Sequence, residues 1–181
     1  HGVAAAIKKT LKLLPAYPDP SYKALKRALG AHHGISPSNI LPGNGSTELI
    51  YLIPAVFRPK KALIVEPAFS EYRRALNISG CRTDGFILRE KDGFSLDVTR
   101  LLKEIKRGWR LVYLANPANP AGGLVEKKSI IDITKSCAGA GATLVVDEVF
   151  ADFAEEVSVK EEAARFKNLV VLRSMTKFFG L

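Results

Sequence analysis

Three polar residues that follow short apolar runs of this chain have side chains that could do chemistry together. They are Asn119 after the run 111–114, Asp147 after the run 143–146, and Lys177 after the run 169–172. An amide donates hydrogen bonds, a carboxylate stabilises a neighbouring positive charge, and an amine can act as a nucleophile. Any one of these residues alone is typical of a turn, a cap or a solvated surface. Together, in this order, they predict a catalytic site.

The three side chains form the set that a pyridoxal ring requires. The amine of Lys177 can form a Schiff base with the aldehyde of the ring if it is partly desolvated. The carboxylate of Asp147 can keep the pyridine nitrogen protonated, which maintains an electron sink for a carbanion at the substrate Cα. The amide of Asn119 can hold the phenolic oxygen. We therefore predict pyridoxal 5'-phosphate (PLP) as the cofactor and these residues as the catalytic residues.

A glycine-rich turn, GNGST (43–47), opens directly into a predicted helix. Backbone N–H groups and hydroxyls at the positive end of a helix favour an anion. We expect Gly45, Ser46 and Thr47 to bind the cofactor phosphate, although such a turn in isolation indicates only a helix cap.

The strands that must position these residues are predicted from apolar runs rich in β-branched residues. The runs lie at 62–65, 86–88, 111–114, 143–146 and 169–172, and helical stretches separate most of them. Short continuous apolar runs are typical of parallel strands that are covered on both faces. The pattern predicts an α/β fold with a doubly wound, mostly parallel sheet and helices on both faces. In such a sheet the ligand lies beyond the carboxyl ends of the strands, where the polar residues fall.

Helical spacing predicts further elements before the first strand. The predicted helices run from 4 to 14, from a cap at Ser21 to about His33, and from 46 to about 57. Gly34 would end the second helix, and Pro54 would bend or shorten the third. His32 and His33 have no acidic or histidine partner one turn away, so we interpret them as packing or surface residues. We divide the chain into an N-terminal helical segment, 1–40, and a cofactor-binding large domain, 41–181.

The composition excludes several classes of protein. A hydrophobic fraction of 47% with 25% charged residues is typical of a soluble globular protein, and no apolar run is long enough for a membrane helix. The net charge of +9 is spread among acids, which argues against nucleic-acid binding. No secretory signal is visible, so a cytoplasmic location is the default expectation. Cys81 and Cys137 lie far apart, which favours buried free thiols over a disulfide or a metal site.

Stretches along nearly the whole chain resemble PLP-dependent aminotransferases of class I and II, in the group of the histidinol-phosphate aminotransferases. The stretches are YPDPSYKALKRAL (17–29), LPGNGSTELIYL (41–52), PAFSEY (67–72), NPANPAGG (116–123), LVVDEVFADF (144–153) and VVLRSMTKFFGL (170–181). Their joint occurrence implies the large domain of the PLP-dependent transferase-like fold.

The resemblance implies the same roles for Asn119, Asp147 and Lys177 and adds further cofactor contacts. Phe69 would stack on the face of the ring. Ser174 would join the glycine-rich turn in binding the phosphate, and Thr176 would be a further phosphate contact or only a turn residue. Tyr17 would reach the phosphate in the neighbouring subunit's site, which implies a homodimer. Without the resemblance, Phe69 and Tyr17 would be interpreted as core residues.

The resemblance also implies a small phosphorylated amino acid as the substrate. The segments DEVFADF and SMTKFF, with Phe150 where many of the aminotransferases carry a tyrosine, favour decarboxylation of L-threonine O-3-phosphate in cobalamin biosynthesis. The alternative is an aminotransferase that acts on histidinol phosphate or a similar amine. The bond held perpendicular to the ring is the one that breaks, so substrate orientation selects between the two reactions.

The sequence departs from the family pattern after the lysine motif. The family continues with an arginine for the cofactor phosphate, further strands and a C-terminal domain whose arginines orient the substrate. We therefore expect a truncated chain that is inactive alone. We also expect the strand at 62–65 to lack neighbours, at a cost of about 1–3 kcal/mol for each buried unsatisfied backbone group.

Two further classes remain to be compared. A non-catalytic binding module that keeps half the fold would agree with the missing C-terminal half. A nucleotide-binding Rossmann domain is disfavoured, because no GxGxxG opens a helix after the first strand.

Overall fold

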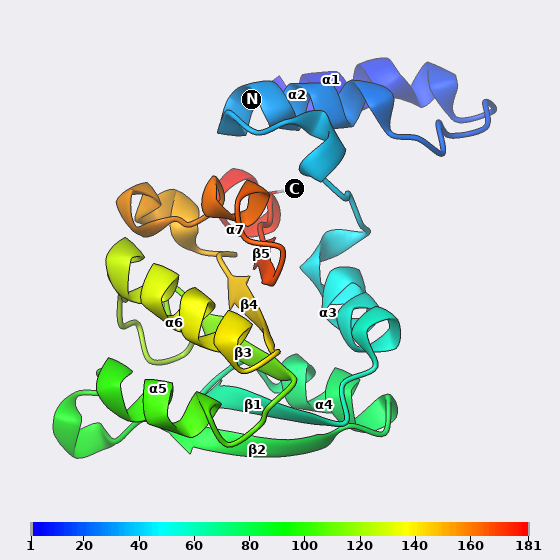
Figure 1. The fold of residues 1–181 in the computed structure, drawn as a ribbon. Helices are drawn as coiled ribbons and strands as arrows, with labels where there is room; N and C mark the ends of the chain where they lie inside the picture. The colour runs from blue at the N-terminus through cyan, green and yellow to red at the C-terminus, as the bar shows by residue number, and fades with distance from the viewer. Residues whose placement is uncertain (1, 181) are drawn as a thin grey trace.

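Five parallel strands form the centre of the molecule in the computed structural model, which describes residues 2–180 (Figure 1). The strands are β1 (Lys61–Glu66), β2 (Arg82–Ile87), β3 (Leu111–Ala115), β4 (Thr143–Asp147) and β5 (Leu169–Leu172), in the order β2-β1-β3-β4-β5. The predicted fold class, an α/β fold with a parallel sheet, is confirmed. His1 and Leu181, the outermost residues of the two predicted segments, lie outside the described residues.

The strand β1 has a neighbour on each side, so the prediction that it would lack partners is wrong. Ala62 aligns with Leu111 of β3, and Val65 aligns with Phe86 of β2. Both partner strands lie before the lysine motif, so β1 needs no strand from beyond it. Within residues 2–180 the edges of the sheet are β2 and β5.

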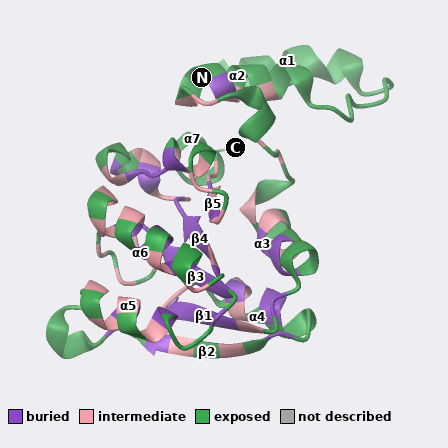
Figure 2. Ribbon diagram, in the orientation of Figure 1, coloured by how far each residue is buried: buried purple, intermediate pink, exposed green. Residues whose placement is uncertain are grey.

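The two faces of the sheet are covered by different helices (Figure 1). The first face carries α3 (Gly45–Phe57) and α4 (Ser70–Ile78), and the second carries α5 (Val98–Ile105) and α6 (Lys127–Gly139). Successive strand residues alternate between the two hydrophobic clusters: Ile64 packs on the first face, whereas Leu63 and Val65 pack on the second. The three central strands, β1, β3 and β4, are therefore almost wholly buried (Figure 2).

The helix α3 continues for one turn past Pro54 instead of stopping before it. A proline cannot donate to the carbonyl four residues earlier, which here belongs to Ile50. The hydroxyl of Tyr113, on β3, lies 3.5 Å from that carbonyl and donates to it instead. A residue of the sheet thus compensates for the interruption of the helix.

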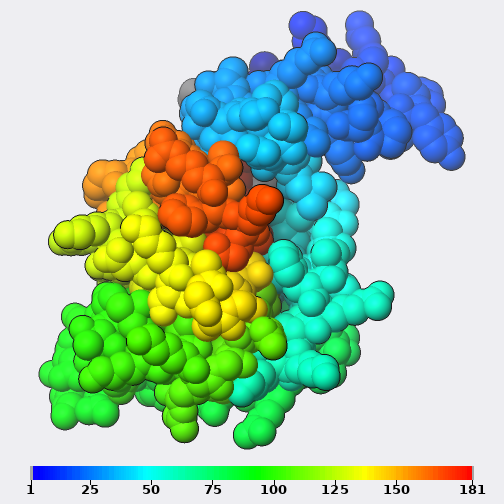
Figure 3. Space-filling model, viewed as in Figure 1, coloured from blue at the N-terminus to red at the C-terminus, as the bar shows by residue number. Residues whose placement is uncertain are grey.

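The first 40 residues contain α1 (Gly2–Thr10) and α2 (Lys23–His33), and they project from the body of the molecule (Figure 3). No residue of α1 is buried. The predicted cap at Ser21 is wrong, because the carboxylate of Asp19 accepts from the backbone N–H groups of Ser21 and Lys23, at 2.9 and 3.0 Å. Gly34 ends α2 in the left-handed region, with φ +68°, as expected.

Within residues 2–180, seven short helices connect the longer elements or follow the last strand. The short helices are η1 (Leu11–Leu13), η2 (Pro37–Asn39), η3 (Glu90–Asp92), η4 (Ala151–Phe153), η5 (Glu155–Val157), η6 (Glu162–Ala164) and α7 (Thr176–Phe179). Cys81 and Cys137 are buried free thiols, as predicted. No helix among the described residues has the length and apolar character needed to cross a bilayer.

Candidate active site

A pocket of about 410 Å³ opens at the carboxyl edge of the sheet. All the predicted cofactor-binding residues except Tyr17 line it, namely Gly45, Ser46, Thr47, Phe69, Asn119, Asp147, Ser174, Thr176 and Lys177. They come from the start of α3, the start of α4, and the segments after β3, β4 and β5. Segments far apart in the sequence therefore contribute to one site, as expected for the carboxyl ends of parallel strands.

Asp147 is the last residue of β4, and its carboxylate is buried at the base of the pocket. Its backbone aligns with Ala115 of β3 and Leu172 of β5. Its side chain accepts a hydrogen bond from the Tyr72 hydroxyl and one, 2.9 Å long, from the backbone N–H of Val149. Burial raises the pKa of the Asp147 carboxyl above its ordinary value, and the two hydrogen bonds only partly oppose that rise.

Tyr72 is a site residue that the sequence analysis missed. It lies on α4, is only 2% exposed, and its ring stacks on Tyr113 with centroids 4.9 Å apart. Burial and the neighbouring Asp147 charge raise the pKa of the Tyr72 hydroxyl far above its ordinary value, so it stays protonated and donates. The Tyr72 ring also meets that of Phe69, three residues earlier, edge to face with centroids 5.9 Å apart.

Asn119 lies in a loop that Asn116 closes. The buried amide of Asn116 donates to the carbonyl of Val125 at 3.0 Å and accepts from the N–H of Val125 at 2.8 Å. Within the loop, the N–H of Ala118 donates to the carbonyl of Gly123 at 2.9 Å. Asn116 thus shapes the backbone that presents Asn119 to the pocket, a role the sequence analysis did not assign.

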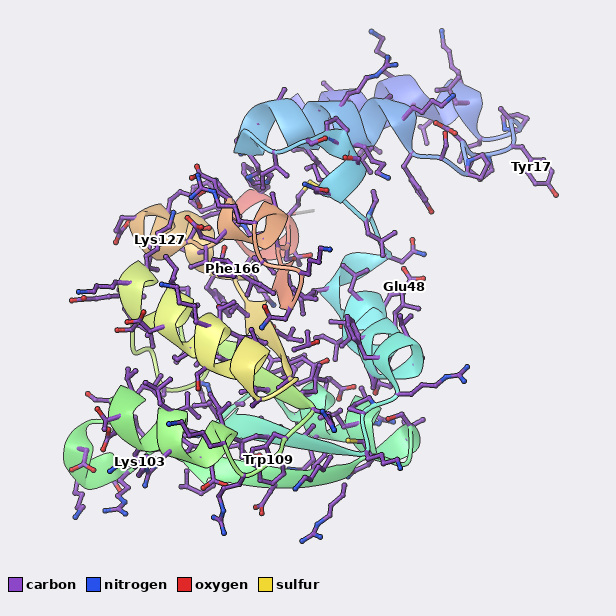
Figure 4. The ribbon with its side chains drawn as sticks, in the orientation of Figure 1. Tyr17, Glu48, Lys103, Trp109, Lys127 and Phe166 are labelled. Carbon is purple, nitrogen blue, oxygen red and sulfur yellow. The ribbon has the colours of Figure 1, made fainter. Side chains whose placement is uncertain are left out.

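The N-terminus of α3 forms a second wall of the pocket. Gly45 has φ +77°, which brings the chain into the helix through a conformation that suits glycine. Glu48, labelled in Figure 4, accepts from the backbone N–H of Asn44 at 2.5 Å. Backbone N–H groups in the first turn of a helix have no intrahelical acceptor, so Ser46 and Thr47 can offer theirs to an anion.

Lys177 lies on α7, five residues after its strand β5 ends at Leu172. Its side chain is exposed and lines the pocket. In the preceding turn, the hydroxyl of Ser174 accepts from the backbone N–H of Thr176 at 3.1 Å. The turn therefore brings a hydroxyl and the amine to the same wall.

Tyr17 is not brought together with the other predicted residues. It is fully exposed at the far end of the N-terminal segment and points into solvent (Figure 4). It does not contribute to the pocket of its own chain.

The residues that line the pocket fit PLP by their chemistry. A helix N-terminus suits the phosphate, a buried carboxylate suits a protonated pyridine nitrogen, an aromatic side chain suits the ring face, and a lysine amine suits the aldehyde. Phe150, which also lines the pocket, offers no hydroxyl to the ring.

Several known proteins are similar to this chain. The family model of aminotransferases of class I and II matches residues 3–181. A threonine-phosphate decarboxylase from Salmonella typhimurium is 36% identical over 99% of this chain and 49% of its own length. A histidinol-phosphate aminotransferase from Ruminiclostridium cellulolyticum is 34% identical over 93% of this chain and 47% of its own length.

A solved structure extends the comparison to three dimensions. The histidinol-phosphate aminotransferase from Sinorhizobium meliloti, solved in complex with pyridoxal 5'-phosphate, is 25% identical, with a TM-score of 0.89 over 99% of this chain and 49% of that chain. The present chain spans about half the length of the curated relatives it matches.

Proposed function

This chain belongs to the class I and II aminotransferase family, and on that premise we propose that its pocket binds PLP and that Lys177 holds the cofactor covalently. One observation carries the proposal: Asn119, Asp147 and Lys177 line the same pocket as the N-terminus of α3. The solved relative with bound PLP supports the same cofactor.

Each residue has a proposed task. The carboxylate of Asp147 holds the proton on the pyridine nitrogen, and Tyr72 and Val149 keep that carboxylate in place. The amide of Asn119 binds the phenolic oxygen, and Phe69 packs on the ring face. Gly45, Ser46, Thr47 and Ser174 bind the phosphate, with Thr176 as a further contact.

When bound, PLP supplies an electron sink for the electrons of a bond that breaks at the substrate Cα. Lys177 would be the residue that moves a proton at that carbon, because its amine is the only one among the described residues that line the pocket. Of the described residues that line the pocket, Lys177 is the only cation. We therefore expect these residues to bind the cofactor without sustained turnover, since no arginine in the pocket holds a substrate carboxylate.

We propose decarboxylation of L-threonine O-3-phosphate, a step of cobalamin biosynthesis, as the reaction of this protein. The Salmonella decarboxylase, 36% identical, and the apolar Phe150 in the pocket support this choice. Amino transfer from histidinol phosphate is the second candidate, supported by the Ruminiclostridium relative at 34% identity. Release of CO2 from threonine phosphate without a keto acid supports the first, and transfer of the amino group to 2-oxoglutarate supports the second.

We also propose that the active form is a homodimer. The full exposure of Tyr17, away from its own pocket, supports a contact with a second subunit.

The cofactor proposal is tested by the substitution Lys177→Ala. The unaltered chain mixed with PLP is expected to develop the visible absorbance of a lysine-bound cofactor, and borohydride reduction should fix the label on the peptide that contains Lys177. The Ala variant should lose both signals, because no other amine lines the pocket among the described residues. Lys103→Ala, an exposed lysine of α5 far from the pocket (Figure 4), is the matched control and should retain both. A labelled Lys177→Ala chain with an unchanged spectrum would contradict the proposal.

A further inference from the structure

A buried cluster of charges lies directly behind the pocket. The guanidinium of Arg173 contacts the carboxylates of Glu148 at 3.2 Å, Asp152 at 2.8 Å and Glu155 at 2.9 Å. The side chain of Glu148 is fully buried and that of Arg173 is 16% exposed. The Arg173–Glu148 pair is therefore mostly shielded from water, and charges interact more strongly in such a place than in water. The side chain of Glu155, at 44% exposed, lies nearer the surface.

Glu148 has a complete set of partners only while Arg173 is present. The hydroxyl of Ser158 and the backbone N–H of Val159 each donate to its carboxylate at 2.6 Å. Burial raises the pKa of the Glu148 carboxyl, and these donors and the Arg173 charge oppose that rise. Loss of Arg173 would leave an uncompensated buried carboxylate, which is strongly unfavourable.

The cluster joins the two strand ends that carry the proposed catalytic acid and amine. Glu148 follows Asp147, and Arg173 precedes the turn that leads to Lys177. The N–H of Glu148 donates to the carbonyl of Leu172 at 2.8 Å. The backbone pairing of β4 and β5 therefore continues to the residues that form the ion pair. Neither Glu148 nor Arg173 lines the pocket, but each adjoins a residue that does, since Glu148 follows Asp147 and Arg173 precedes Ser174. An effect of the ion pair on the cofactor would therefore pass through these neighbours.

We propose that Arg173 and Glu148 are positioning residues whose ion pair fixes the separation between the Asp147 carboxylate and the Lys177 amine. The inference rests on the proposed binding of PLP to that pocket. A buried ion pair often adds little net stability compared with apolar residues, but the planar guanidinium has a fixed direction that a lysine cannot reproduce. Its contacts with the segment between β4 and β5 hold that direction.

The test compares PLP affinity with stability in matched variants. Arg173→Lys keeps the positive charge but loses the planar set of N–H donors. We expect it to bind PLP about tenfold more weakly, which is the size of effect that outer-shell partners have at metal sites. The yield of borohydride-trapped label at Lys177 should fall with it. Arg165→Lys, at an exposed arginine that pairs with Glu162 at 3.3 Å, is the control and should match the unaltered chain.

A double variant separates positioning from folding. Arg173→Met with Glu148→Gln removes the guanidinium and the charge of the fully buried Glu148. Its unfolding midpoint should therefore be higher than that of Arg173→Met alone, while its PLP affinity should stay low. If the double variant and the Lys variant bind PLP as tightly as the unaltered chain, the positioning role is overturned. The same holds if affinity recovers together with stability. Absence of any Lys177 label in the unaltered chain would instead overturn the proposed function.

Discussion

The Asp147 carboxylate meets two opposing demands. Burial favours its neutral form, whereas the hydrogen bonds from Tyr72 and Val149 favour the ionised form that a pyridinium partner needs. Of these two donors only Tyr72 donates from a side chain, so a substitution at Tyr72 can change the hydrogen bonding and the pKa of the carboxylate.

Tyr72→Phe should destabilise the protein by about 1.5–3 kcal/mol, because a buried hydrogen bond to a charged group is lost. It should also weaken PLP binding. Urea unfolding near pH 8 measures the first effect and titration with PLP the second. Tyr51→Phe removes a hydroxyl that donates to Glu71 near the surface, at 2.5 Å, and should change both quantities much less. Equal losses in the two variants would contradict this account of Tyr72.

Asp147→Asn should make the cofactor-free protein more stable than the unaltered chain at pH 7. The folded state raises the Asp147 pKa above its ordinary value of 3.8, so ionisation penalises folding. That penalty is absent below pH 3.8, grows as the pH rises from 3.8 to the folded pKa, and is constant above it. The advantage of the Asn variant should therefore shrink as the pH falls from neutral towards 3.8.

Unfolding free energies measured across that range check the prediction. Asp132→Asn, at a half-exposed acid of α6, is the control, and its difference from the unaltered chain should stay small throughout. An Asp147→Asn variant that is less stable than the unaltered chain at neutral pH would contradict the sign.

At the residue scale, the sequence predicted the residues that touch the pocket better than those that support them. Asn119, Asp147 and Lys177 follow apolar runs, and parallel pairing alone brings such positions to one edge. Tyr72 and Asn116 act through contacts with residues 75 and 9 positions away, which no local pattern encodes. Phe69 could be assigned only from resemblance.

At the scale of elements, the loop after β3 depends on one side chain. The side chain of Asn116 pairs with the backbone of Val125 as a neighbouring strand would, since its NH2 group donates to the carbonyl of Val125 and its oxygen accepts from the N–H of Val125. The loop therefore has a defined shape without regular secondary structure.

Asn116→Ala should lower the free energy of unfolding by about 1–3 kcal/mol, because the N–H and carbonyl of Val125 lose their part-buried hydrogen-bond partner. The amide of Val125 should exchange with solvent hydrogen faster, and PLP binding should weaken because Asn119 lies in the same loop. Asn77→Ala is the control, because the side-chain carbonyl of Asn77 accepts an exposed hydrogen bond, 3.2 Å long, from the hydroxyl of Thr83. Unchanged exchange at Val125 would contradict the proposed role of Asn116.

The sequence predicted strands with a continuous apolar run more accurately than the strand that lacks one. The bounds of β1, β3, β4 and β5 fall within one residue of the predicted runs, whereas β2 begins at Arg82, four residues before the predicted start. As an edge strand β2 alternates exposed and half-buried residues, so it has no continuous apolar run. The cap predicted at Ser21 is wrong because the carboxylate of Asp19, four residues before Lys23, reaches the N–H of that first helical residue.

At the scale of the whole molecule, the N-terminal helix contributes little to the core. Val3, Ile7 and Leu11 lie on α1 and η1 and are all exposed. The helix α2 is different, since Leu25, Leu29 and His33 face Met175 and Phe179 of the body across a second cavity.

Deletion of residues 2–16 should therefore leave the unfolding midpoint of the body nearly unchanged. The single tryptophan, Trp109, is buried in the cluster on the α5 and α6 face, so its fluorescence reports the body alone. Deletion through Gly34 is the contrast and should lower the midpoint, because it also removes the α2 face. A large loss from the shorter deletion would contradict the assignment.

Strand pairing was the part of the architecture that local reasoning could not supply. Apolar runs identify strands but not their neighbours, and the position of β1 was inferred from resemblance and was wrong. Only contacts between residues far apart, such as Ala62 beside Leu111, determine the order.

Within residues 2–180, β5 lies at an edge of the sheet, and this position affects how the cofactor leaves. This strand has four residues and is joined to the sheet by a single ladder, yet it leads directly to Lys177. Segments anchored on one side open at a smaller free energy than the centre of a sheet. Fraying of β5 would withdraw the lysine while the other strands stay folded, and a ligand that bridges Lys177 and Asp147 would oppose that fraying by mass action.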